Sequence, residues 1–258
     1  MNEAGLVAHQ LRYDLLVTWR NPQSRFFAIA LPVIFLVLLA SVFGNHTTHV
    51  NDHAVKNSTY YVPGISTLGI VAVSFVNLVI TITAQRESGV LKRRRSTPVP
   101  AWILITSRAL TAMVLAIVLV VVLVAIGRIG YGVHLPGATI PAYALGVAVG
   151  ASCFCCLAFA MASFIRSEES AQPIIQATVL PPYFISGVFI PKSQLSSTLS
   201  DVASVFPVSH LDGALFKAFD PATHGSGISW HDLVILAAWG AGGLLVALWR
   251  FSWSPQNL

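Results

Sequence analysis

Charged residues are scarce in this sequence. Asp, Glu, Lys and Arg make up 10% of its 258 residues, whereas hydrophobic residues make up 55%. A soluble domain usually carries about a quarter charged residues. The apolar residues form long runs that recur along the whole chain. The scarcity of charge therefore excludes a soluble globular protein and predicts a multi-pass membrane protein.

Several motifs that carry chemistry are missing. None of the eight His residues is followed by Glu, which excludes the His-Glu-x-x-His motif of zinc proteases. No Gly-x-Ser-Gly sequence occurs, and no Lys follows a Gly, so a P-loop is absent as well. We therefore expect no enzyme activity, no nucleotide site and no cofactor or metal on this chain.

Cysteines and membrane-embedded carboxylates are also few. The three cysteines, Cys153, Cys155 and Cys156, lie in one apolar run, which excludes a disulfide framework between loops. Buried cysteines are mostly small packing residues, and a copper-type site is the alternative interpretation. All ten Asp and Glu residues fall in predicted loops or at the ends of apolar runs. We therefore expect no carboxylate that carries protons at the middle of the membrane.

Six apolar stretches are long enough to cross a bilayer, which needs roughly 20 residues each. They cover approximately residues 26–43, 61–84, 101–127, 139–165, 171–190 and 233–251. The resulting prediction is an all-α integral membrane protein with six transmembrane helices in a single domain, residues 1–258.

Residues 1–22 are predicted to form an amphipathic helix in the plane of the membrane interface. One face carries Ala4, Val7, Ala8, Leu11, Leu15 and Trp19. A second short helix, re-entrant or interfacial, is predicted before the last span. Leu195, Leu199, Val202 and Phe206 lie there at helical spacing.

Single residues inside the spans allow two interpretations each. Pro173, Pro181 and Pro182 break the fifth span, either to line a cavity or to kink the helix for packing. Arg108 lies near the cytoplasmic end of the third span, where we expect its side chain to snorkel to the interface. Small residues at Gly146 and Gly150 and at Gly240, Gly242 and Gly243 allow close helix contact. That contact is either between two copies of the chain or a chance feature of glycine-rich helices.

The distribution of basic residues predicts the orientation. With six spans, both termini share one side with residues 85–100, and that side carries eleven of the fifteen Lys and Arg residues. The positive-inside rule places this side in the cytoplasm of a plasma membrane. The net charge of +5 is then explained by contact with anionic membrane lipids, without a nucleic acid.

The densest charge lies in the loop QRESGVLKRRRSTPVP, residues 85–100. Such a loop is either a topology anchor or a docking segment for a cytoplasmic partner. Gly89 allows a bend, and Pro98 and Pro100 force the next helix to restart. Val90 and Leu91 place apolar side chains beside the cations, a combination that suits a groove on a partner protein.

This loop resembles the coupling segment of ABC transporter type-2 permeases, in the branch that includes drug-resistance exporters. The matching residues are Glu87, Gly89, Val90, Leu91, Lys92, Ser96, Thr97, Pro98 and Pro100. Weaker likenesses are the stretch RNPQSRFFAIALPVIFLVLLASVFG after the first helix and FPVSHLDGALF before the last span. The basic run here is more basic than is usual in that family, and Phe216-Lys217 stands where an arginine often follows.

The resemblance implies a permease that forms the path for outward transport of a hydrophobic or amphipathic compound such as a drug, antibiotic or lipid. ATP and Mg²⁺ would bind two copies of a separate ABC ATPase subunit, and a second permease copy or a paralogue would complete the complex. The implied coupling residues are Arg86, Glu87, Gly89, Val90, Leu91, Lys92, Arg93, Arg94 and Arg95. The implied substrate path includes Asn77, Pro181, Pro182, Tyr183 and Phe184. The alternative function is a gradient-driven transporter or channel subunit without an ATPase partner.

Overall fold

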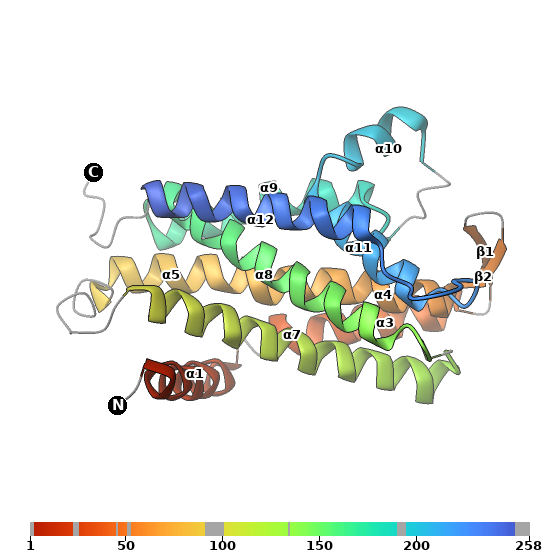
Figure 1. The fold of residues 1–258 in the computed structure, drawn as a ribbon, viewed down its shortest axis with the longest axis horizontal. Helices are drawn as coiled ribbons and strands as arrows, with labels where there is room; N and C mark the ends of the chain where they lie inside the picture. The colour runs from red at the N-terminus through yellow and green to blue at the C-terminus, as the bar shows by residue number, and fades with distance from the viewer. Residues whose placement is uncertain are drawn as a thin grey trace.

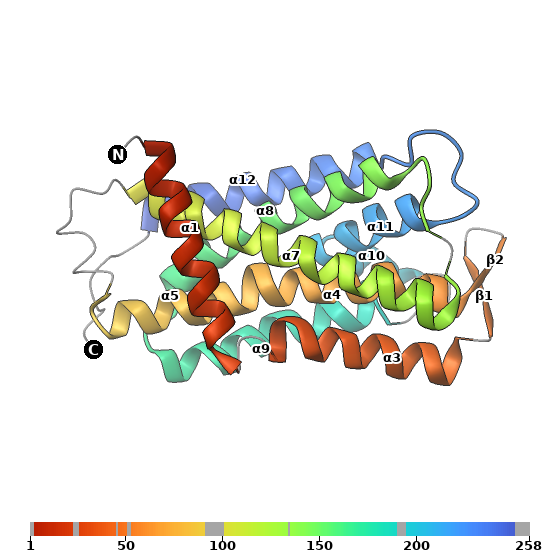
Figure 2. The ribbon, with the colours of Figure 1, turned by 90° about the horizontal axis from the view of Figure 1, so that it is seen from below.

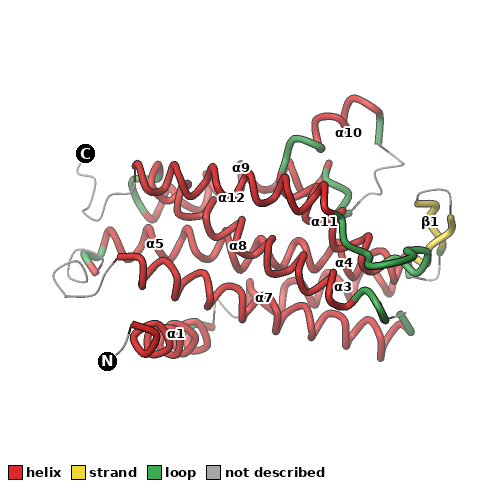
Figure 3. Tube along the Cα trace, in the orientation of Figure 1, coloured by secondary structure: helices red, strands yellow, loops and turns green. Residues whose placement is uncertain are grey.

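The computed structural model describes residues 3–22, 26–44, 46–50, 53–90, 101–133, 135–189 and 195–250. Long helices run side by side along one axis, and the first described helix and the end of the last described helix lie at the same end of this bundle (Figure 1). We call this the terminal end, and the opposite end, which carries the two strands, the far end. Helix dominates the trace (Figure 3).

Each predicted apolar stretch is largely helical, and further elements lie between them. The elements are α1 (Glu3–Arg20), the π-helical turn η1 (Phe26–Ala30), α3 (Leu31–Phe43), β1 (Thr47–Val50), β2 (His53–Lys56), α4 (Asn57–Val71), the π-helical turn η2 (Ala72–Val76), α5 (Asn77–Glu87), α7 (Ala101–Tyr131), α8 (Ile140–Phe164), α9 (Glu168–Ile185), α10 (Ser197–Ala203), α11 (Pro207–Phe219) and α12 (Trp230–Arg250).

Among the residues that the structure describes, four helices are long and apolar enough to cross a membrane. They are Asn57–Glu87, Thr106–Tyr131, Ile140–Phe164 and Trp230–Arg250. Ala28–Phe43 is a shorter apolar helix, and α9 has 18 residues, about 27 Å of helix. These elements confirm a helical membrane protein, and the count of six spans stays a prediction.

The continuous helix α4–η2–α5 is the most buried of the four. Some of its buried hydroxyl groups are satisfied by bonds within the helix. Ser66 Oγ donates to the Val62 carbonyl at 2.7 Å, and Thr83 Oγ1 donates to the Val79 carbonyl at 2.9 Å. With these hydroxyl groups satisfied, the helix can lie at the centre of the bundle.

Glycines allow α8 to approach two other helices of the same chain. A Cβ atom at Gly150 would lie 2.4 Å from the Leu211 side chain of α11, and one at Gly240 of α12 would lie 3.2 Å from the Cys153 Cα atom. Gly146 and Gly243 make equally close contacts with α11 and α8. These four glycines therefore serve packing within one chain, whereas a Cβ atom at Gly242 would have no neighbour within 4 Å, and a contact between copies stays a prediction. Cys153 and Cys155 are buried in this packing.

The segment before the last span folds back into the bundle. The predicted short helix after Leu195 is α10, and it is followed by α11, whose residues are almost all buried. Ring contact between Tyr60 and Phe216, with centroids 5.4 Å apart, holds α11 against α4. Asp212 is therefore buried within a packed helix, which corrects its predicted place in a loop.

The far end also carries an antiparallel hairpin of β1 and β2, with Thr47 paired to Lys56 and Val50 to His53. It is an exception to the predicted all-α class. Each strand has only four residues, too few for a clear alternation of polar and apolar side chains.

Candidate functional site

The predicted coupling segment begins where α5 ends, at the terminal end of the bundle. The amide of Ser88 donates to the Ala84 carbonyl at 2.9 Å, and the amide of Gly89 to the Arg86 carbonyl at 3.1 Å. Gly89 has φ +70°, a left-handed conformation that glycine adopts without a steric cost. The predicted bend at Gly89 is confirmed. Leu91, Lys92, Arg93, Arg94 and Arg95 lie outside the described residues.

Arg86 is a buried link between α5 and α8, with only 1% of its surface exposed. Its Nη1 atom donates to the Ala162 carbonyl at 2.9 Å, and its Nη2 atom donates to the Ile165 carbonyl. These carbonyls lie at the C-terminal end of α8, where the helix has unpaired acceptors and a partial negative charge. Arg86 is therefore fixed in the protein and is not a solvated topology anchor.

Glu87 makes the complementary contact with the next helix. Its Oε2 atom accepts a hydrogen bond from the backbone amide of Glu168 at 2.7 Å. Glu168 is the first residue of α9, where free amides give the helix end a partial positive charge. Two consecutive side chains, one cationic and one anionic, thus bind the two helix ends that flank residues 165–167. The start of the predicted coupling segment is therefore tied to the junction of α8 and α9.

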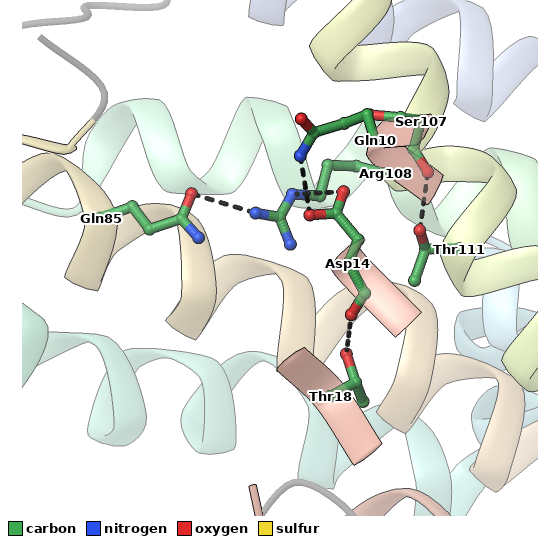
Figure 4. A network of polar contacts seen from close by, with 7 residues as sticks. All are labelled: Gln10, Asp14, Thr18, Gln85, Ser107, Arg108 and Thr111. Carbon is green, nitrogen blue, oxygen red and sulfur yellow. Dashed lines mark hydrogen bonds and ion pairs between the residues drawn. The ribbon is translucent and has the colours of Figure 1, made fainter. Parts of the chain in front are cut away.

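A second polar network joins α1, α5 and α7 near the same end (Figure 4). Arg108 of α7 donates from Nη2 to Gln85 Oε1 at 3.2 Å, and its Nε atom lies 3.4 Å from Asp14 Oδ2 of α1. Gln10 Nε2 donates to Asp14 Oδ1 at 2.9 Å. The expected snorkelling of Arg108 is wrong, because the guanidinium group is buried against a carboxylate of the same chain.

Helix α1 crosses the long helices at their terminal end, close to α7 (Figure 2). Its buried face includes Asp14, whereas Trp19 is 59% exposed and Ala8 is also exposed. The interfacial helix stays a prediction, and the contact of Asp14 with Arg108 turns the Asp14 side of α1 toward the bundle.

The arrangement can transmit a displacement. Arg86 and Glu87 connect the end of α5 to α8 and α9, and Gln85 connects it through Arg108 to α7 and α1. The Arg86 contact is buried and the Arg108–Gln85 contact is part-buried, whereas the Glu87 contact lies at the surface. A partner that moves the chain just after Gly89 would therefore move the ends of several helices together.

The predicted substrate-path residues do not share one surface. Tyr183 is buried, and its hydroxyl group donates to the Leu68 carbonyl at 3.1 Å. Phe184 points outward and is 55% exposed, with its ring centroid 5.7 Å from that of Phe189. Pro181 is exposed, Pro182 is buried, and Asn77 is half-buried on α5.

Sequence reasoning missed Asp14 and Gln85 as members of the site. A signal for Asp14 was present, since a single carboxylate stands on the same helix face as Val7, Leu11 and Thr18. A lone carboxylate on such a face and a lone arginine in a span predict each other as partners. Gln85 gave no comparable signal.

Comparison with known protein families identifies the family of the chain. Residues 7–219 match the family described as ABC-2 type transporter. The match covers most of the chain and includes the Arg86–Glu87 pair, the Asp14–Arg108 pair and α11. No curated protein sequence matches the chain.

Proposed function

Because this chain belongs to the ABC-2 type transporter family, whose members are membrane permeases that normally work with an ATPase subunit, we propose that it forms the translocation path of an ATP-driven exporter. The exported compound is hydrophobic or amphipathic, in the class of drugs, antibiotics and lipids. Two ATPase subunits bind the complex, and a second permease, identical or paralogous, completes it. The family match supports the permease role, and the contacts at the end of α5 support the coupling.

The observation that carries the proposal is the pair of links made by Arg86 and Glu87. The ATPase subunit docks on residues 85–100 and moves them when it binds and hydrolyses ATP. Arg86 passes this motion to the C-terminal end of α8, and Glu87 passes it to the N-terminal end of α9. Since both links are made at the charged ends of helices, the displacement reaches α8 and α9 directly.

The orientation follows from the charges of the described residues. Helix α1, which contains Arg12 and Arg20, lies at the terminal end, as do the ends of α5 and α12, whose last turns contain Arg86 and Arg250 (Figure 1). Arg108 contacts α1 and α5 there, and Arg166 lies in the junction of α8 and α9 that Glu87 contacts. Lys56 belongs to β2 at the far end, and Arg128 and Lys217 belong to the last turns of α7 and α11. The positive-inside rule therefore places the terminal end in the cytoplasm, where ATP is available. In this proposal α3 and α9 are the first and fifth spans. Together with the four long apolar helices they make six spans, and α1 lies at the cytoplasmic interface.

The substrate path is proposed along the outward face of α9, between two permease copies. Pro181 and Phe184 are exposed on this helix. An apolar face of this kind suits a hydrophobic compound that enters from the membrane. Tyr183 supports the path from behind through its bond to Leu68.

Purification from native membranes tests the ATPase partner. The tagged chain is isolated in mild detergent, and the proteins that accompany it are identified by mass spectrometry. We expect a P-loop ATPase in roughly equal amount. A pure chain without such a partner, from cells that express it at native levels, would contradict the proposal and favour a gradient-driven transporter.

A further inference from the structure

Three side chains of types that bind metal ions meet toward the far end of the bundle, away from the predicted coupling segment. His210 lies near the start of α11, and His231 and Asp232 lie in the first turn of α12. One potential ligand atom from each lies within 4.8 Å of the other two. Among the residues that the structure describes, no other group of three His, Cys, Asp or Glu side chains has this arrangement.

The hydrogen bonds of His210 define its tautomer. Its ring is buried, with 6% exposed, and its Nε2 atom lies 2.7 Å from the Ser204 carbonyl oxygen. A carbonyl oxygen only accepts, so Nε2 carries the hydrogen and donates it. In a neutral ring, Nδ1 then has a free lone pair, and this atom lies 2.7 Å from Asp232 Oδ1. Two acceptor atoms at this separation need a cation between them, either a proton or a metal ion.

The carboxylate of Asp232 is also oriented by a hydrogen bond from outside the cluster. Its second oxygen, Oδ2, accepts a hydrogen bond from Ser229 Oγ at 2.6 Å. The absence of a side chain at Gly213 lets the carboxylate approach α11, since a Cβ atom there would lie 3.2 Å from Oδ2. Metal-binding His and carboxylate groups are usually oriented by such outer hydrogen bonds, to a backbone carbonyl and to a hydroxyl group. Here both outer partners are present.

His231 supplies the third donor. Its ring centroid is 5.9 Å from that of His210, and the residue is exposed, whereas His210 is buried. An ion bound here would therefore have two ligands inside the protein and one at its surface. The remaining coordination position would be open to water.

We propose that His210, His231 and Asp232 form a binding site for a divalent transition-metal ion of the Zn²⁺ type. Two imidazoles and one carboxylate are a ligand set that zinc accepts, with a water molecule in the fourth position. The ion takes the place of the proton between His210 Nδ1 and Asp232 Oδ1. The ion would connect α11 to α12 toward the far end of the bundle, opposite the predicted coupling segment.

The geometry requires only a small adjustment. With bonds of about 2.0 Å and tetrahedral angles, two zinc ligands lie about 3.3 Å apart. The Nδ1 and Oδ1 atoms are 2.7 Å apart in the structure without a metal. A shift of the Asp232 side chain, which is 19% exposed, supplies this difference, and rotation of the exposed His231 ring completes the site.

Zinc binding to the purified full chain tests the proposal. The protein in detergent is treated with chelator, and ZnCl₂ is then titrated by calorimetry, with MgCl₂ as a control ion. We expect one zinc ion per chain, a raised unfolding temperature and no response to magnesium. His231→Ala should weaken zinc binding at least tenfold, because an exposed ligand is removed without disturbing the core.

His224→Ala is the matched control, since His224 is exposed in the loop before α12 and lies outside the cluster. This variant should bind zinc as the unaltered chain does. Asp232→Asn, which keeps the size of the side chain, should also lose the ion. The proposal is wrong if the unaltered chain binds no zinc, in which case a proton alone joins His210 to Asp232. It is equally wrong if His224→Ala weakens binding as much as His231→Ala.

Discussion

The Asp14 carboxylate of α1 lies 3.4 Å from the Nε atom of Arg108 on α7, and the two side chains are 3% and 9% exposed. This ion pair joins the helix before the first apolar stretch to a long membrane helix. Through Arg108 it also contacts Gln85, next to the predicted coupling segment.

Asp14→Ala tests the ion pair, because it leaves the buried Arg108 charge without its carboxylate. Breaking a buried pair in this way costs about 3–5 kcal/mol. We expect a clear fall in the unfolding temperature of the purified chain. Adding Arg108→Met should restore part of the loss, since the uncompensated charge is then gone. Arg12→Ala, at an exposed position of α1, serves as the control. Losses that simply add in the double variant would contradict the pairing.

Arg86→Gln tests the link between α5 and α8. The variant removes a buried charge that donates to the Ala162 and Ile165 carbonyls, and each such charged bond contributes about 1.5–3 kcal/mol. We expect reduced ATP-dependent efflux of a hydrophobic dye, measured per amount of protein in the membrane. Arg166→Gln changes an exposed arginine at the same junction and should transport normally. Normal efflux by inserted Arg86→Gln would show that the link has no role in coupling.

Substitutions of Glu87 test the contact with α9. Glu87→Ala removes the acceptor for the Glu168 amide, a loss comparable to that of a helix N-cap, about 1 kcal/mol. The chain should insert and fold, and ATP-driven export should fall. Glu87→Gln keeps an acceptor oxygen and should retain more of the export activity. Equal activity of the two variants in the same efflux assay would argue against this hydrogen bond as the transmitting contact.

Tyr183 and Phe184 are adjacent but should respond in opposite ways. Tyr183→Phe removes the hydrogen bond to Leu68 and should lower the free energy of unfolding by about 1–2 kcal/mol, with little change in the range of exported compounds. Phe184→Ala changes an exposed ring and should alter that range with little change in stability. The check is a panel of hydrophobic dyes combined with thermal unfolding. An unchanged export profile for Phe184→Ala would remove this face of α9 from the substrate path.

Much of the helical framework could be predicted because a bilayer demands long apolar helices. The stretch 139–165 corresponds to α8 (Ile140–Phe164), and 26–43 corresponds to η1 and α3 (Phe26–Phe43). The bend at Gly89 was predictable for a similar reason, since a glycine after a helix commonly adopts a left-handed conformation.

Other features depend on contacts between distant residues, which one sequence does not reveal. The polar residues of FPVSHLDGALF suggested an exposed segment next to the last span, whereas α11 is buried. Phe216 packs on Tyr60, and the Thr139 hydroxyl group donates to the Ala218 carbonyl. The direction in which α1 crosses α7 determines that Asp14 is buried against the bundle and that Trp19 is exposed. From the sequence, Arg86 could equally be a solvated basic residue that fixes the topology. Its two acceptors, the Ala162 and Ile165 carbonyls, become evident only from the position of the last turn of α8.

The central claim is that an ATPase docks where α5 ends, and site-specific crosslinking tests it most directly. A photoreactive amino acid is placed at Val90, the last described residue before the basic run, and in a separate variant at Ile129, an exposed position toward the far end of α7. Irradiation of intact cells should attach a P-loop ATPase to the chain at Val90 and not at Ile129. Failure to capture a P-loop protein at Val90, in cells where the chain is exporting substrate, would contradict the account.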